Sequence, residues 1–303
     1  MTIEGFETVT VSAGPLEAAF APALGMAGVS LRHDGAELLD RQAGLLAYAR
    51  SGAVMGVPLL YPWANRLAAH EYLLDGHDVR LPPGPPLVRC EEHGLPIHGL
   101  LHASPHWRVT ARAAARIGAR LDFDAHPELL AAFPFPHTLE IEAALAPDRL
   151  RITTTVRPTA ATAVPIAFGF HPYLRLPGAP RADWEVTLPA RRRLNLDERG
   201  IPTGPGERRP ATRLALAERS FDDGYDALAC RSAFSVTGGG RVLTVELESG
   251  YPAAQVFSPR GTDFICFEPM TAPTNALLSG EGLRRVAPGD AFTAAFSIAV
   301  SGV

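Results

Sequence analysis

Hydrophobic and polar residues alternate with a period of two in several stretches of this 303-residue chain. Residues 150–156 are the clearest example, because β-branched side chains are frequent there and apolar positions recur at every second residue. Such a pattern is typical of a strand with one buried face. Short segments between glycines and prolines predict strands at Trp107–Thr110, Arg120–Phe123, Leu139–Leu145, Leu150–Arg157, Val242–Leu247, Ala253–Phe257, Asp263–Glu268 and Ala291–Val300.

Glycine and proline, 28 of each, are spread along the chain and separate these segments. Gly238–Gly240 lies between two predicted strands, which indicates a hairpin turn. The segments 82–86 and 202–210 are rich in proline and glycine and are expected to form surface loops. One or two turns of helix are expected at Pro127–Ala132. The chain is therefore predicted to be all-β, with very little helix and no alternation of strand and helix.

The bulk composition narrows the class of protein. Hydrophobic residues make up 47% and charged residues 20% of the chain, which suffices for a full core. The strand pattern does not change along the chain and no low-complexity linker interrupts it, so residues 1–303 are expected to form a single domain. The net charge of −4, with no basic stripe, argues against nucleic-acid binding.

The cellular location follows from three further features. Residues 44–64 are fairly apolar, but Arg50 and several glycines and prolines interrupt them, so no membrane span is expected. The first residues show no signal-peptide pattern. The three cysteines, Cys90, Cys230 and Cys266, have no framework spacing and indicate free thiols. A cytoplasmic protein is predicted.

All ten histidines lie between His33 and His171. His93, His98, His102 and His106 raise the question of a metal site. The glycines and prolines among them disfavour the helix that would align them, and no set of cysteines or carboxylates completes a zinc site. We therefore predict that no metal is bound, and that His102 and His106 are structural or solvated.

Two ionisable residues each end an apolar run. Glu268 closes residues 263–268 and shares a strand face with Phe264 and Cys266, so its pKa is expected to be raised and it could act as a general base. His171 closes residues 166–171, where small neighbours on its face leave space for a ligand. Taken alone, each has a commoner explanation, a surface glutamate or a core histidine.

Other polar residues also adjoin apolar segments. Asn65 and Arg66 offer donors and an acceptor suited to a polyhydroxyl ligand, although an ordinary ion pair is the commoner fate of an arginine. His98 precedes a glycine, which lets a ligand or a turn approach the backbone. Gln255 lies within an apolar strand and needs partners. Residues 221–225, which contain Asp222, are a turn by composition.

Taken in order, these motifs resemble the aldose 1-epimerase (galactose mutarotase) family. The matching segments are Gly56–Leu67, Ile97–Gly99, Gly169–Tyr173, Phe221–Asp223, Gln255–Phe257 and Phe267–Pro273. The resemblance implies a large antiparallel β-sandwich, called a supersandwich, with an open cleft. It also implies a small-molecule sugar substrate and no cofactor. A monomer or a homodimer is expected.

The resemblance further implies roles for individual residues. Glu268 would be the base that takes the proton from the anomeric hydroxyl, and His171 the acid that protonates the ring oxygen. His98 and Arg66 would stabilise developing charge. Asn65, Asp222 and Gln255 would bind hydroxyls. Such chemistry needs an ionised Glu268 and a protonated His171 in one cleft.

Three hypotheses remain open at this point. The first is a mutarotase acting on a free aldose such as galactose or glucose. The second is an enzyme of the same superfamily acting on a hexose 6-phosphate, which would need a basic cluster at the cleft. The third is a carbohydrate-binding protein without catalysis. Asp222 and Glu268 would repel a phosphate, and Arg66 is the only fixed cation among the predicted site residues. A phosphate would have to lie outside this set, against arginines such as those at 191–193, so the free aldose is favoured.

Overall fold

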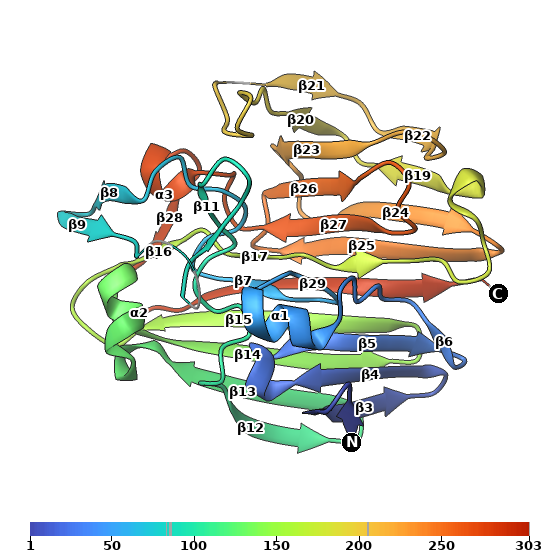
Figure 1. The fold of residues 1–303 in the computed structure, drawn as a ribbon, viewed down its shortest axis with the longest axis horizontal. Coiled ribbons are helices and arrows are strands. Elements are labelled where there is room, and N and C mark those ends of the chain that lie inside the picture. Colours follow the sequence, from blue (N-terminus) through green and yellow to red (C-terminus); the bar gives the residue numbers. More distant parts are fainter. Residues whose placement is uncertain (83, 85–86, 205, 303) are drawn as a thin grey trace.

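The computed structural model describes residues 1–82, 84, 87–204 and 206–302, and it is drawn in Figure 1. Strands account for about 50% of the structure and helices for 9%. Neighbouring strands in each described sheet run antiparallel. The prediction of an all-β, antiparallel fold with very little helix is confirmed.

One layer of the molecule is a nine-stranded sheet. Its strands, in spatial order, are β12 (Arg108–Ala113), β13 (Arg116–Asp122), β14 (His137–Ala146), β15 (Arg149–Pro158), β29 (Phe292–Ser301), β25 (Arg241–Ser249), β24 (Ser232–Gly238), β19 (Glu185–Leu188) and β22 (Thr212–Ala215). Buried and partly exposed residues alternate along β14 and β15, as expected for strands with one face in the core.

The second layer consists of two sheets side by side. The eight-stranded sheet contains β21 (Glu207–Arg209), β20 (Arg191–Arg193), β23 (Phe221–Asp226), β26 (Ala253–Ser258), β27 (Ile265–Met270), β17 (Gly169–Phe170), β7 (Leu59–Leu60) and, also on β27, β18 (Tyr173–Leu174). The four-stranded sheet contains β3 (Val9–Ala13), β4 (Leu16–Ala21), β5 (Ala27–His33) and β6 (Ala36–Glu37). Reciprocal backbone hydrogen bonds between Gly28 and Val57 join the two sheets.

Aromatic side chains fill the space between the layers. Phe234 of β24 packs on Phe267 of β27 with ring centroids 5.7 Å apart, and Phe170 of β17 packs on Phe296 of β29 at 5.0 Å. The four-stranded sheet covers β13 and β14 (Figure 1). The main core therefore lies between the layers, and burial of this apolar surface is the principal stabilising contribution.

A second apolar cluster lies on the outer face of the eight-stranded sheet. It includes Cys266 and Met270 from β27, Tyr173 from β18, and Leu45 and Tyr48 from the helix α1 (Leu45–Ser51). Because residues of a strand alternate between faces, Glu268 projects toward this cluster and away from the main core. Its carboxylate is thereby placed beside apolar groups.

The remaining elements are short. They are the strand pairs β1 (Thr2–Ile3) with β2 (Phe6–Glu7), β8 (Glu71–Leu74) with β9 (His77–Arg80), β10 (Arg89–Cys90) with β11 (Pro96–Ile97) and β16 (Val164–Ile166) with β28 (Arg284–Val286), the helices α2 (Pro127–Ala132) and α3 (Ala276–Ser279), and the 3-10 turns η1 (Pro22–Leu24), η2 (Phe123–Ala125) and η3 (Arg181–Asp183). None of the described helices is long and apolar enough to cross a membrane.

The strands and the helix predicted from the sequence are all found, with shifts of a few residues at their ends. Gly239 and Gly240 form the two-residue turn between β24 and β25, and both have positive φ, as a primed hairpin turn requires. One loop prediction needs correction. Residues 207–209 of the expected 202–210 loop form the edge strand β21, while residue 205 lies outside the described residues. In the 82–86 segment, residues 83, 85 and 86 also lie outside them.

The prediction of a turn at residues 221–225 is wrong, because the whole segment belongs to strand β23. The acidic residues that suggested a turn are held by neighbouring strands. Asp223 forms an ion pair with Arg193 at 2.6 Å, and Asp222 accepts a hydrogen bond from Gln255 at 2.6 Å. Cross-strand partners therefore outweigh the local preference of Asp and Gly for turns.

Candidate active site

The register of strand β27 brings His171 and Glu268 together. β17 and β18 pair with β27 at Gly169 and Tyr173, respectively. His171 lies midway between these paired residues, so the antiparallel register sets it opposite Glu268. On the other edge of β27, Gln255 of β26 is the register partner of Glu268. The three side chains therefore form one row across the sheet.

A glycine permits the close approach of these strands. A Cβ atom at Gly169 would lie 2.5 Å from the carbonyl oxygen of Pro269 and 2.9 Å from the Cβ of Ala64. No side chain fits at that distance without displacing the backbone. Gly169 is thus required for the geometry two residues before His171.

His171 and Glu268 form a buried pair. The Nε2 atom of His171 lies 3.3 Å from the Oε1 atom of Glu268, and the two residues are 4% and 2% exposed. The imidazole stacks on Tyr173, with centroids 4.5 Å apart and planes inclined by 6°. The edge of the His98 ring lies against it at 5.4 Å. These contacts fix the orientation of the imidazole toward the carboxyl group.

Burial is the dominant influence on the protonation of this pair. It raises the pKa of Glu268 well above its usual range, and the charge of Asp222 adds to the rise while Arg66 opposes it. It lowers the pKa of His171 to about 3, with a further contribution from Arg89. Burial thus favours the neutral forms of both groups, whereas the sequence led us to expect an ionised Glu268 and a protonated His171.

His98 and Asn65 are positioned by unusual backbone conformations. Both have positive φ, 67° and 56°, and the backbone N–H of His98 donates to the carbonyl oxygen of Asn65 at 2.9 Å. The next residue, Gly99, has φ +76°, and a Cβ there would lie 2.1 Å from the carbonyl oxygen of Tyr61. Strained backbone of this kind is common where side chains are held for function.

Arg66 and Asp222 lie beside this pair. Arg66 Nη1 donates to the Asn65 side-chain oxygen at 3.1 Å, and its guanidinium is 3.5 Å from Glu91 and 3.9 Å from Asp222. Asp222 also accepts from Gln255 Nε2 at 2.6 Å. The polar side chains of the site therefore form a connected network of charges and hydrogen bonds.

These residues line one cavity of about 180 Å³, which we call the site cavity. All predicted site residues border it: Asn65, Arg66, His98, His171, Asp222, Gln255 and Glu268. Three buried polar atoms of these residues, Glu268 Oε2, His98 Nδ1 and His171 Nδ1, have no hydrogen-bond partner among the described residues. Because buried polar atoms are normally paired, such atoms indicate where a polar ligand binds.

The sequence did not reveal that Arg89 also borders the site cavity. Its side chain is partly buried and makes no hydrogen bond or ion pair with any described residue. Burial lowers its pKa. Arg89 lies in a two-residue strand with no distinctive motif, so no sequence signal identified it. Tyr173 and Glu91 are lining residues as well, and Tyr173 could have been inferred from its place beside His171.

The arginines at 191–193 do not provide a second free basic cluster. Arg192 forms an ion pair with Asp226 at 2.5 Å, and Arg193 forms one with Asp223 at 2.6 Å. The guanidinium of Arg191 donates to backbone carbonyl oxygens and lies over the ring of Tyr225. None of the three borders the site cavity.

The four histidines considered for a metal site do not converge. His98 borders the site cavity, while His102 is buried against Gly52, where an added Cβ would lie 2.5 Å from the imidazole. His93 is near Glu92 on the surface. His106 instead meets two residues that are distant in sequence, His126 and Glu128.

The fold is a galactose mutarotase-like β-sandwich. The structure superposes on a galactose mutarotase-like protein from Clostridium acetobutylicum with a TM-score of 0.86, at 17% identity over 100% of this chain and 98% of that one. For the Slr1438 protein from Synechocystis sp. PCC 6803 the TM-score is 0.81, at 22% identity over 100% and 98%. For the GalM/aldose epimerase homologue from C. elegans it is 0.77, at 15% identity over 98% and 99%.

A sequence model of the aldose 1-epimerase family matches residues 7–299. The chain therefore belongs to the aldose 1-epimerase family. No curated protein gave a significant sequence match. The solved structures are too distant in sequence to carry more than the fold.

Proposed function

We propose that this protein is an aldose 1-epimerase that interconverts the α and β anomers of a free aldose such as galactose or glucose. The observation that carries the proposal is the 3.3 Å contact between His171 Nε2 and Glu268 Oε1 in a cavity lined by hydrogen-bonding groups. Opening a sugar ring requires removal of one proton and addition of another at neighbouring oxygens. An adjacent carboxyl and imidazole are suited to both transfers.

In the proposed reaction, Glu268 takes the proton of the anomeric hydroxyl and the bond between the anomeric carbon and the ring oxygen breaks. His171 gives its proton to the ring oxygen. Rotation about the neighbouring carbon–carbon bond exposes the other face of the aldehyde. Closure reverses each transfer, with the imidazole recovering its proton from the hydroxyl and Glu268 returning one to the anomeric oxygen.

The pair holds one proton throughout this cycle. Before opening, the carboxylate is ionised and the imidazole is protonated; after opening, both groups are neutral. Burial stabilises the neutral arrangement, so it favours the state that accompanies the open-chain sugar. Sugar hydroxyls at Glu268 Oε2 and the charge of Arg66 offset the cost of the ionised arrangement. The ionised and neutral arrangements are then close in free energy, so neither one stops the cycle.

The other cavity residues have supporting roles in this proposal. Arg66 and His98 stabilise negative charge that develops on the sugar oxygens, and Asn65, Asp222 and Gln255 bind hydroxyls. The pKa of His98 is lowered well below its usual range, first by burial and then by His171. His98 is therefore a neutral hydrogen-bonding group. The side chains supply every proton transfer, so the mechanism calls for no cofactor.

The direct test is measurement of anomer exchange by two-dimensional NMR. Purified protein is added to a panel of free aldoses at equilibrium, and exchange cross-peaks between the α and β signals are quantified. An increase over the buffer rate for at least one aldose is expected. Binding without any increase, seen as line broadening at unchanged exchange rate, would instead identify a carbohydrate-binding protein.

Arg89 favours a second candidate, an aldose that carries an anionic group such as a phosphate. The guanidinium borders the cavity and has no counter-ion among the described residues. Asp222 and Glu91 are already engaged with Arg66 at 3.9 and 3.5 Å. A partly buried cation without a partner is costly, and an anionic substituent would provide that partner.

The two candidates are distinguished by comparing kcat/KM for glucose and glucose 6-phosphate in the wild type and in Arg89→Gln. If the phosphate contacts Arg89, the variant loses at least about tenfold more on the phosphorylated sugar than on glucose. The matched control is Arg80→Gln, because the Arg80 side chain is 80% exposed and outside the cavity. An equal decrease in kcat/KM for both sugars would show that Arg89 does not contact the phosphate, and the free aldose would remain the proposed substrate.

A further inference from the structure

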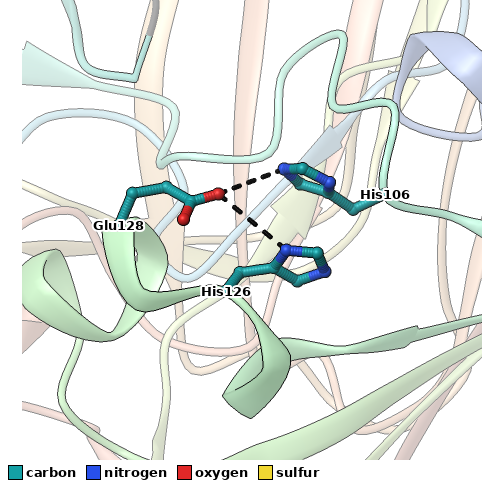
Figure 2. A group of neighbouring side chains, drawn as sticks. All are labelled: His106, His126 and Glu128. Atoms are coloured by element: carbon teal, nitrogen blue, oxygen red, sulfur yellow. Dashed lines mark ion pairs between the residues drawn. The ribbon is translucent and has the colours of Figure 1, made fainter.

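Three metal-ligating side chains meet at a surface position outside the site cavity. His106 lies at the end of the loop that precedes β12, His126 lies between η2 and α2, and Glu128 is in the first turn of α2. Figure 2 shows both imidazole rings and the carboxylate oriented toward one another. None of the three residues borders the site cavity. We call this group the His106 cluster.

The distances within the His106 cluster are those of a ligand set. His106 Nε2 lies 3.3 Å and His126 Nδ1 lies 3.9 Å from the same carboxylate oxygen, Glu128 Oε1. One ligand atom from each residue lies within 4.8 Å of the others. With metal–ligand bonds of about 2.0–2.1 Å, ligand atoms of a tetrahedral ion are separated by roughly 3.3 Å. Small side-chain rotations would therefore bring all three to one ion.

The surroundings allow those rotations and leave coordination positions open. The side chains of His106 and Glu128 are 32% and 49% exposed, and the two imidazoles are stacked at 3.8 Å with planes inclined by 28°. His106 and Glu128 border a surface pocket of about 320 Å³, together with Ser104 and Leu129. Water or a further ligand could reach an ion from this pocket.

We propose that His106, His126 and Glu128 form a binding site for a divalent transition metal ion of the Zn²⁺ type. Two imidazoles with one carboxylate match the preferences of Zn²⁺, and they exclude the all-oxygen environment that Mg²⁺ and Ca²⁺ require. The bound ion ties the loop that ends at His106 to helix α2. This proposal is independent of the proposed catalytic activity, because it uses none of the cavity residues.

The test is a binding measurement on untagged, chelator-stripped, full-length protein. Isothermal titration with Zn²⁺ should give one ion per chain, and Co²⁺ should give the visible absorption of a tetrahedral nitrogen and oxygen site. His126→Asn and Glu128→Gln should each weaken Zn²⁺ binding by at least about tenfold. A fixed concentration of Zn²⁺ should raise the melting temperature of the wild type more than that of either variant.

His93→Asn is the matched control, because the His93 side chain is also exposed, at 40%, and lies beside Glu91 and Glu92, the other possible ligand group among the described residues. The control should retain wild-type affinity. The melting temperatures of the metal-free variants show whether they fold. Absence of one-to-one binding in the wild type, or equal affinity in folded His126→Asn and Glu128→Gln, would overturn the proposal, as would loss of binding in His93→Asn alone.

Discussion

His171 and Glu268 face one another across two antiparallel strand pairs, with Nε2 and Oε1 3.3 Å apart. The backbone of β17 and β18 on β27 fixes this separation, since the pairs at Gly169 and Tyr173 lie symmetrically on either side of His171. Groups built on paired strands are held more rigidly than groups on loops. The pairing of the strands therefore sets the distance between His171 and Glu268, and single substitutions can test its role.

Replacing Glu268 by Gln preserves the shape of the side chain and removes the proposed proton acceptor. We expect kcat for anomer exchange to fall at least about a hundredfold, the lower end for loss of a general base. The near- and far-ultraviolet circular dichroism spectra should remain those of the wild type. Turnover close to that of the wild type would show that another group is the base.

Replacing His171 by Asn removes the proposed acid and should reduce turnover by a similar factor. His106→Asn serves as the comparison, because His106 lies outside the site cavity. Anomer exchange is measured for both variants in metal-free buffer on the same sugar. A larger loss in His106→Asn would contradict the assignment of the acid.

The pH dependence of kcat/KM should respond to charges near Glu268. The one-proton pair is inactive once the last proton is lost, so the alkaline limb follows the raised pKa of Glu268. Asp222 raises that pKa and Arg66 lowers it. Asp222→Asn should therefore move the alkaline limb to lower pH, and Arg66→Gln should move it to higher pH. Shifts in the same direction for both variants would refute this account.

Stability should fall in mild acid because of His137, which is fully buried in the core. Its Nδ1–H donates to the Phe135 carbonyl oxygen, its Nε2 accepts from the Tyr61 hydroxyl, and burial lowers its pKa to about 4. The unfolded state, with a pKa near 6.5, binds the proton first. This contribution is complete above pH 6.5 and is lost as the pH falls toward 4.

The loss amounts to ~3 kcal/mol for a shift of this size. Urea unfolding of the wild type and of His137→Gln at neutral pH and near the lower end of this range measures it. The difference in unfolding free energy between the two proteins should shrink as the pH falls. A difference that stays constant with pH would show that His137 does not titrate in this way.

Gly169→Ala tests the close approach of β17 and β27. The added methyl group would meet backbone at 2.5 Å, so we expect a loss of ~2–3 kcal/mol in unfolding free energy. Displacement of His171 should also lower kcat at least about tenfold, because small misplacements of reacting groups are costly. Gly261→Ala is the control, since its Cβ meets nothing within 4 Å and only the positive φ is strained. Wild-type turnover in Gly169→Ala would show that the spacing of β17 and β27 does not affect catalysis.

The sequence was informative where one physical rule dominated. Alternation located β14 and β15, because each has one buried face. Composition was misleading at Asp222. The Asp-Gly segment suggested a turn, but Gln255, 33 residues away, holds the Asp222 carboxylate in a strand. Such a contact depends on register between strands, which local composition does not encode.

The candidate site likewise contains residues that local sequence identifies and residues that only the packing of distant segments brings together. Glu268 and His171 stood out because a charged or polar residue ended an apolar run, and the structure places both in one cavity. Arg89 could not be identified, since its neighbours in sequence carry no pattern and its position depends on the pairing of β10 with β11. The meeting of His106 with His126 likewise results from the packing of a loop on α2.

The division of the site cavity between a sheet and the β10–β11 hairpin has a consequence for substrate range. His171 and Glu268, the proposed proton-transfer pair, belong to the sheet, whereas Arg89 and Glu91 reach the same cavity from the hairpin. Substitutions in the hairpin change the charge and shape that a substrate meets without disturbing strand register. Under the proposed function, the substrate range of this fold could therefore be altered by exchanging a short surface segment, without moving His171 or Glu268.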